Sequence, residues 1–189
     1  MTSAPYKFGH LDATGNEAPY KYGNCWAIEQ TTGPSRLVIA PASGHIALIT
    51  RLAAAMREPF GLLYVLPVPR GGGESGRYQS PAPVNFADME LFLWQFQELF
   101  EQDARQHVWI GSVDNSSLLV YDNHDVIYAY GPLREFEGVL TSSGLAKCDD
   151  VRFPKPHMHN YNVEFDEQQL AILKYWKWTR YPLEESDDR

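Results

Sequence analysis

The segment from Asn85 to Gln106 carries the feature that most constrains how this chain can fold. Large apolar residues recur in it every three or four positions, as on the buried side of an α-helix, and form a stripe of Met89, Phe92, Leu93, Phe96, Leu99 and Phe100. Asn85 can cap such a helix, and Asp88 falls in the first turn, where the helix dipole favours a carboxylate. A stripe of this size must be covered, so the segment predicts a helix packed against a substantial core.

Several β-rich runs accompany this helix, at residues 24–30, 36–40, 62–68, 108–113, 118–121 and 126–130. The last three are separated only by the turn-forming tetrapeptides Asp114-Asn115-Ser116-Ser117 and Asp122-Asn123-His124-Asp125. Connections this short predict an antiparallel meander. The nearly continuous apolar run from Leu62 to Val68 predicts a central strand buried on both faces.

Further helix signals lie between and after these strands. Ser43 offers a cap for an amphipathic helix that ends before Pro59, and Pro132 suits the first turn of another that Gly144 terminates. Asp166 with Gln169 forms a capping pattern before a C-terminal helix. The sequence therefore predicts an α+β fold, with a mainly antiparallel sheet of about six strands packed with three to four amphipathic helices.

The length of 189 residues fits one domain, which we expect to span residues 1–189. Residues 1–23 mix Gly, Pro, Lys and Tyr without periodicity and predict an irregular N-terminal arm. Residues 184–189 are charged and predict a frayed acidic C-terminal tail.

The charge balance limits the partners of the chain. A net charge of −8 argues against nucleic-acid binding, because such binders concentrate Lys and Arg against phosphates. An acidic surface suits a basic protein partner, although it also simply keeps a domain soluble. The chain shows no apolar run long enough to span a membrane and no signal peptide at its start, so we expect no membrane association and a cytoplasmic location.

Two histidines form the sharpest candidate for chemistry. His157 and His159 lie two residues apart in a run, 157–165, that alternates as a strand does, so both imidazoles would project from one face toward one cation. With Glu164, their spacing resembles part of the first metal-binding motif of the cupin family. The resemblance implies that His157, His159 and Glu164 ligate a divalent transition metal. Regular alternation, however, sets Glu164 on the opposite face, and a solvent-facing histidine pair without metal is the alternative.

Other motifs predict less. The loop Arg70-Gly71-Gly72-Gly73-Glu74-Ser75-Gly76-Arg77 has backbone groups that could cradle an anion, but it lacks the ending of a P-loop, and a mobile connection between strands is the alternative. Cys25 and Cys148 are too few for a disulfide framework and are interpreted as structural thiols. No set of catalytic residues and no other cofactor site is predicted.

A family resemblance provides the leading functional hypothesis. The runs Ile110-Gly111-Ser112, Leu118 to Asp122 and Val126 to Tyr130, followed by Phe136 to Leu140, resemble the strand–turn–strand–helix ending of SUKH-superfamily immunity proteins. Those are small acidic bacterial proteins that bind and block toxins. The resemblance implies a non-catalytic protein-binding module, an immunity-type antagonist of a basic toxin partner, and it transfers no site residues. The alternative hypothesis is a metal-dependent enzyme that uses His157 and His159.

Overall fold

A computed structural model describes residues 4–188. In this part of the chain the strands are β1 Phe8–Leu11, β2 Glu17–Pro19, β3 Cys25–Glu29, β4 Arg36–Ala40, β5 Phe60–Leu66, β6 Gly76–Gln79, β7 His107–Ser112, β8 Leu118–Tyr121, β9 Ile127–Tyr130, β10 Ala146–Lys147, β11 His157–His159 and β12 Thr179–Tyr181. The α-helices are α1 His45–Ala53, α2 Phe86–Gln95, α3 Gln97–Gln102, α4 Leu133–Ser142 and α5 Asp166–Tyr175, with short 3-10 helices η1 Val163–Phe165 and η2 Glu185–Asp188.

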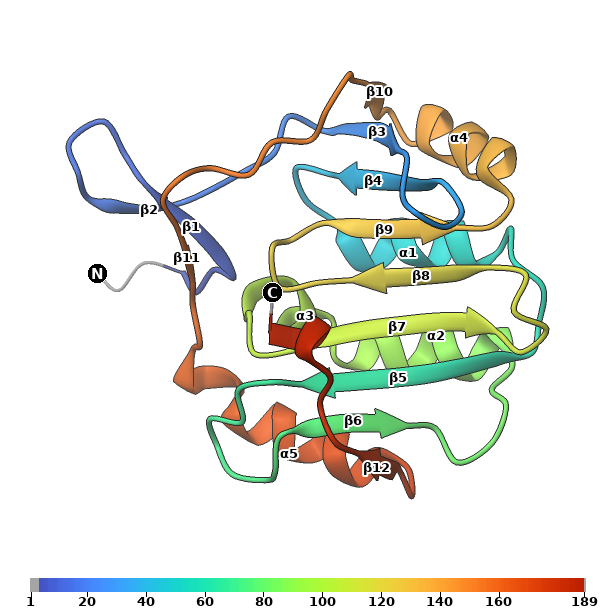
Figure 1. Ribbon diagram of the computed structural model, residues 1–189. Helices are drawn as coiled ribbons and strands as arrows, with labels where there is room; N and C mark the ends of the chain where they lie inside the picture. The colour runs from blue at the N-terminus through green and yellow to red at the C-terminus, as the bar shows by residue number, and fades with distance from the viewer. Residues whose placement is uncertain (1–3, 189) are drawn as a thin grey trace.

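The strands form two sheets (Figure 1). Over the described residues, a nine-stranded sheet has the order β10-β3-β4-β9-β8-β7-β5-β6-β12, and a three-stranded sheet has the order β11-β1-β2. Neighbouring strands are antiparallel, except that β10 runs parallel to β3. The α+β class is confirmed, but the expected number of about six strands is too low. The six β-rich runs between residues 24 and 130 are all strands, and the run predicted at 157–165 is a strand only at His157–His159. The strands that were not predicted are two to four residues long, too short to show a periodicity.

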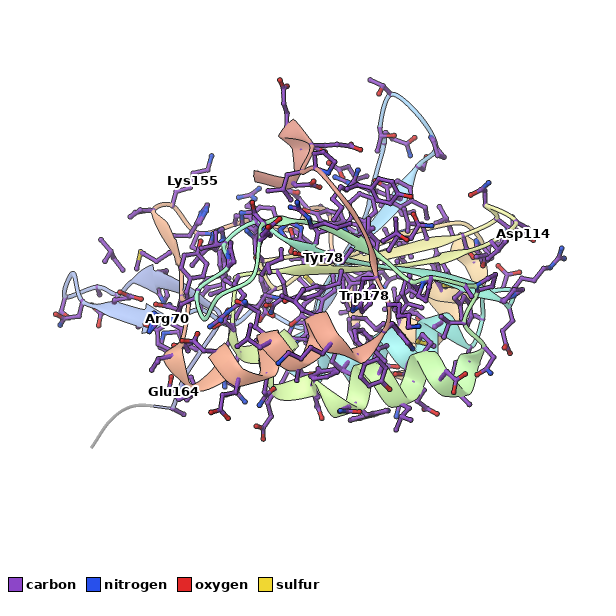
Figure 2. The ribbon with its side chains drawn as sticks, turned by 90° about the horizontal axis from the view of Figure 1, so that it is seen from below. Arg70, Tyr78, Asp114, Lys155, Glu164 and Trp178 are labelled. Carbon is purple, nitrogen blue, oxygen red and sulfur yellow. The ribbon has the colours of Figure 1, made fainter. Side chains whose placement is uncertain are left out.

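The helices cover one face of the large sheet (Figures 1 and 2). Side chains alternate along each strand, so Val108 and Ile110 of β7 enter the core with the helices while Trp109 lies on the other side. We call this second side the open face. A smaller apolar cluster covers it near β3 and β4, where Val151 and Phe153 pack. None of the helices in residues 4–188 is long and apolar enough to cross a membrane.

The apolar stripe at residues 85–106 is buried as predicted, but it belongs to two helices. All six residues of the stripe lie in the core, and the side chain of Asn85 accepts the N–H of Asp88 at 2.8 Å, as a cap. The expected continuous helix is interrupted at Phe96, which separates α2 from α3, and it ends at Gln102. The chain leaves the helix after Gln102, where the side chains of Asp103 and Arg105 enter the polar network described below.

Both chain ends are more ordered than expected. The N-terminal segment contains the β1–β2 hairpin, and Phe8 and Tyr22 are buried against the domain. The C-terminal segment forms η2 in front of the open face (Figure 1), where buried Asp187 lies 3.5 Å from Arg77. Residues 1–3 and 189, which were included in the predicted arm and tail, lie outside the described residues.

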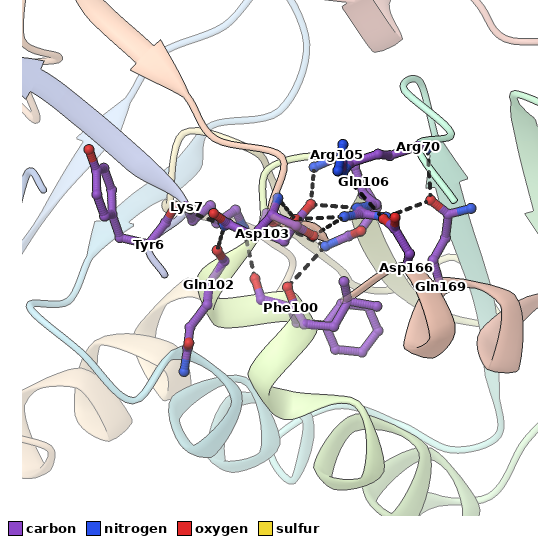
Figure 3. Close-up of polar contacts among 12 residues, drawn as sticks. Tyr6, Lys7, Arg70, Phe100, Gln102, Asp103, Arg105, Gln106, Asp166 and Gln169 are labelled. Carbon is purple, nitrogen blue, oxygen red and sulfur yellow. Dashed lines mark hydrogen bonds and ion pairs between the residues drawn. The ribbon is translucent and has the colours of Figure 1, made fainter. Parts of the chain in front are cut away.

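A buried arginine joins α5 to the loop before β7 (Figure 3). The guanidinium of Arg105 donates to both carboxylate oxygens of Asp103, at 2.7 and 3.0 Å. It also donates to Asp166 and Gln169, at 2.9 Å each, and to the carbonyl of Asn162 at 2.6 Å. Asp166 and Gln169 therefore bind Arg105 and do not form the predicted capping pattern. All N–H groups of the guanidinium find acceptors, so this network is structural.

Removal of this guanidinium should strongly destabilise the protein. We expect Arg105→Ala to lower the free energy of unfolding by about 3–5 kcal/mol, because it leaves the buried Asp103 carboxylate without a partner. The matched control is Arg57→Ala, which removes an exposed ion pair with Asp114 and should have little effect. Urea titrations of both variants measure the difference, and equal losses would contradict the structural role of Arg105.

Candidate metal centre

Three histidines meet where the turn between β8 and β9 approaches the small sheet. His124 belongs to that turn, and His157 and His159 belong to β11. Because side chains alternate along a strand, the two β11 histidines project to the same side. Pairing of β11 with β1 places His159 opposite Phe8 and His157 opposite His10.

Asp122 shapes the turn that carries His124. One of its carboxylate oxygens accepts the backbone N–H groups of His124, at 3.0 Å, and Val126, at 3.3 Å. Asp125 completes the turn in the left-handed region, with a φ of 65°. An aspartate that binds the backbone two residues ahead is a common way to stabilise a turn. The position of His124 is thus fixed by local hydrogen bonds that need no ligand.

The three imidazoles are close enough to share one ion. Each offers a nitrogen, and these nitrogens lie within 4.8 Å of one another. A tetrahedral zinc ion with Zn–N bonds of about 2.0–2.1 Å would place its nitrogen ligands about 3.4 Å apart. Small rotations of the rings would therefore bring all three nitrogens onto one ion.

Hydrogen bonds to oxygen acceptors orient two of the rings. Nδ1 of His124 lies 3.1 Å from the second carboxylate oxygen of Asp122, and Nδ1 of His157 lies 3.1 Å from the carbonyl oxygen of Pro154. In both rings Nε2 is left for a ligand. Nε2 of His159 is buried and has no hydrogen-bond partner. Histidines that ligate metals usually donate their other N–H to a carboxylate or a carbonyl in this way.

The electrostatics favour an uncharged His159 that is able to ligate. Burial, together with the neighbouring His124 and His157, lowers the pKa of His159 to about 4. Burial opposes ionisation of Asp122, but its hydrogen bond to His124 and the nearby cationic groups lower its pKa overall. The result is an ionised carboxylate behind one ring and an uncharged ring beside it, which suits a cation.

The candidate centre borders a cavity of about 630 Å³ on the open face of the large sheet. His124 and His157 line one part of it. The other lining residues come from strands β4, β7, β8 and β9, the turn after β8, the segment before β11 and the C-terminal segment: Arg36, His107, Trp109, Leu118, Val120, Asp122, Tyr128, Tyr130, Phe153, Lys155 and Ser186. An ion bound by the three histidines would therefore be accessible to a small molecule.

The structure brings together two of the three residues predicted as ligands, and metal binding by them stays a prediction. His157 and His159 come together as expected, but Glu164 is exposed in η1 and is not part of the cluster. The expected strand at 157–165 ends at His159. His124 was missed because the turn Asp122-Asn123-His124-Asp125 was interpreted only as a connection. An aspartate two residues before a histidine in a tight turn is the signal that could have identified it.

The glycine-rich loop, predicted either to cradle an anion or to be a mobile connection, packs against α5. Its backbone packs on α5, where a Cβ on Gly71 would lie 2.5 Å from the Cβ of Asp166. Arg70 lies 3.4 Å from Asp166, and Arg77 pairs with Glu184. Both flanking arginines are thus engaged within the protein, and the loop holds α5 and the C-terminal segment.

The two cysteines lie side by side. The thiol of Cys148 is 2.8 Å from that of Cys25, and both residues are partly exposed. Burial, and to a smaller extent the hydrogen bond with Cys148, raises the pKa of Cys25 to about 11. A thiol that stays protonated at neutral pH is a poor nucleophile, so Cys25 is not activated for catalysis.

Comparisons with known proteins identify no relative. No protein-family model, no curated protein and no solved structure matches this chain. The resemblance to SUKH-superfamily proteins therefore stays a prediction. The open nine-stranded sheet with helices on one face is not the barrel that the cupin-like spacing implies.

The lowered pKa of His159 predicts a pH dependence of stability. As the pH falls from the ordinary value of 6.5 toward about 4, the unfolded chain takes up a proton at this residue before the folded protein does. The contribution of uncharged His159 to the free energy of unfolding of the metal-free protein should therefore be lost over this interval. His159→Gln should make the decline in stability smaller. Urea titrations at several pH values measure it, with His10→Gln as the control. A decline that is as steep in His159→Gln as in the wild type would contradict the burial of an uncharged ring.

Proposed function

We propose that this protein is a metalloprotein that binds one divalent transition-metal ion through His124, His157 and His159. The observation that carries the proposal is the convergence of three imidazoles from two distant segments, two of them oriented by outer oxygen acceptors. Imidazole ligands suit zinc, copper, iron and nickel. We take zinc as the reference ion because three histidines form one of its common sites.

The number of ligands supports a reactive ion. Among residues 4–188, no further His, Cys, Asp or Glu joins the group of three. Structural zinc sites usually have four protein ligands, whereas catalytic sites have three and leave a position for water or substrate. Such an ion would polarise a carbonyl or activate water. The open position and the adjacent cavity together support metal-dependent chemistry on a small molecule.

A second candidate function is the protein-binding module, an immunity-type antagonist of a basic toxin. The exposed residues Leu91 and Trp94 of α2 favour an interaction surface, because they lie three positions apart on one side of the helix. The net charge of −8 would favour a basic partner. This function does not involve the histidine cluster, so a chain that fails to bind metal would leave it as the remaining candidate.

The protein should bind zinc with a stoichiometry of one per chain. We expect untagged protein, stripped with EDTA and reconstituted, to retain one zinc ion after gel filtration, as measured by elemental mass spectrometry. His124→Ala and His159→Ala should each abolish retention, because two imidazoles hold zinc poorly. His10→Ala is the matched control, since His10 lies opposite His157 on β1 but outside the cluster. Glu164→Gln should also retain zinc.

A milder variant tests the site without removing a ligand. Asp122→Asn keeps the shape of the side chain but weakens the orientation of His124, so we expect its zinc affinity to fall by about 10–100-fold. Wild-type protein without zinc, or histidine variants that retain it fully, would refute the proposed function.

A further inference from the structure

We propose that the cavity on the open face binds a small aromatic carboxylate, with its carboxylate group at the metal end. This inference rests on the proposed function, because two of the proposed ligands, His124 and His157, line the cavity. Its volume of about 630 Å³ matches a drug-sized molecule.

The walls favour a flat, apolar body. Trp109 of β7, Tyr128 of β9 and Phe153 from the segment before β11 supply aromatic rings, while Leu118 and Val120 of β8 supply aliphatic groups. These side chains come from neighbouring strands of one sheet and form a broad surface. Aromatic ligands gain both apolar contact and ring stacking on such a surface.

Strand register gives the cavity two distinct ends. Asp122 directly follows β8 and lies beside His124, whereas Leu118 begins β8 and pairs with Tyr130. At about 3.3 Å per residue, these ends are separated by about 13 Å. We call them the metal end and the far end. A cavity of this length suits an elongated molecule.

Hydrogen-bonding groups without partners favour an anion at the metal end. Val108 of β7 pairs with Tyr121 of β8 in antiparallel register. His107, directly before Val108, therefore lies next to Asp122, directly after Tyr121. Its Nε2 is buried without a partner, as is the indole N–H of Trp109. The indole N–H of Trp109 can only donate, so it favours a ligand that carries an acceptor. Lys155 lies on the side of the sheet opposite the helices (Figure 2) and forms no ion pair within the described residues.

At the far end, the positive charge of Arg36 is already paired with Glu29. Arg36 donates to Glu29 and to the hydroxyl of Tyr130, and its guanidinium lies 4.0 Å from the centre of the Tyr128 ring. Among residues 4–188, Asp122 is the only acidic residue that lines the cavity, and both of its oxygens accept hydrogen bonds from the turn. Thus, in a chain of net charge −8, this cavity presents cations and donors, which selects an anion.

The test uses 2-naphthoate and its neutral analogue 2-naphthamide as probes. Isothermal titration calorimetry of the zinc-loaded full chain should show that naphthoate binds at least about tenfold more tightly than naphthamide. Lys155→Gln should reduce this preference without loss of zinc, and removal of zinc with EDTA should weaken naphthoate binding by about tenfold or more. Trp109→Ala should weaken both probes. Lys21→Gln, which changes an exposed lysine at a different cavity, should leave both unchanged.

The zinc content of each sample separates the two proposals. Zinc at one per chain with no naphthoate binding, or with equal affinity for the two probes, would overturn the carboxylate inference and leave the metal site intact. A chain without zinc would overturn both, because the inference places the carboxylate at the ion. A preference for naphthoate that is reduced in Lys155→Gln and unchanged in Lys21→Gln is the result that supports it.

Discussion

The pairing of β11 with β1 is the interaction on which the candidate metal centre depends. Phe8 of β1 and Lys7, directly before this strand, anchor it on its two sides. On one side, Phe8 is buried and its ring contacts those of His124, His157 and His159 at centroid distances of 5.3 to 5.7 Å. On the other side, Lys7 is buried and reaches the β8–β9 turn. One short strand therefore joins the two segments that supply the histidines.

The environment of Lys7 shows how strongly β1 is held. Its ammonium group donates to the carbonyl of Phe100 at 3.1 Å, lies 3.6 Å from the centre of the Tyr121 ring and is 4.0 Å from a carboxylate oxygen of Asp125. Burial lowers the pKa of Lys7, while Asp125 opposes this shift. Since Asp125 directly follows His124, the anchor of β1 is also part of the turn that positions the first histidine.

Backbone hydrogen bonds hold the residues that follow β11. The backbone N–H of Asn160 donates to the carbonyl of Lys7, and the N–H of Asn162 donates to Asp103 at 2.6 Å. Asp103 in turn binds Arg105, so the structural network of Figure 3 continues into the histidine strand. Binding groups held by packing and by outer hydrogen bonds are preorganised for a ligand. This connection explains why a wholly buried ion pair lies near a candidate functional site.

The sequence predicted the local parts of this arrangement but not those set by tertiary contacts. Alternation along a strand was enough to place His157 and His159 on one side, and apolar spacing was enough to identify the buried stripe of α2 and α3. The turn Asp122-Asn123-His124-Asp125 could mark His124 as a fixed side chain, but it could not show that His124 meets the other two, because that contact depends on the pairing of β1 with β11. Glu164 was misplaced for a related reason: the backbone leaves the strand after His159 to bond with Lys7 and Asp103.

Zinc K-edge X-ray absorption of the reconstituted protein tests the central claim most directly. The histidine cluster predicts a first shell with three imidazole nitrogens at about 2.0–2.1 Å and an additional light atom from water or a ligand. The multiple-scattering signature of imidazole should fall by one ring in His159→Ala samples that are forced to bind zinc. A first shell dominated by sulfur, or one of oxygen atoms alone, would contradict an ion held by His124, His157 and His159.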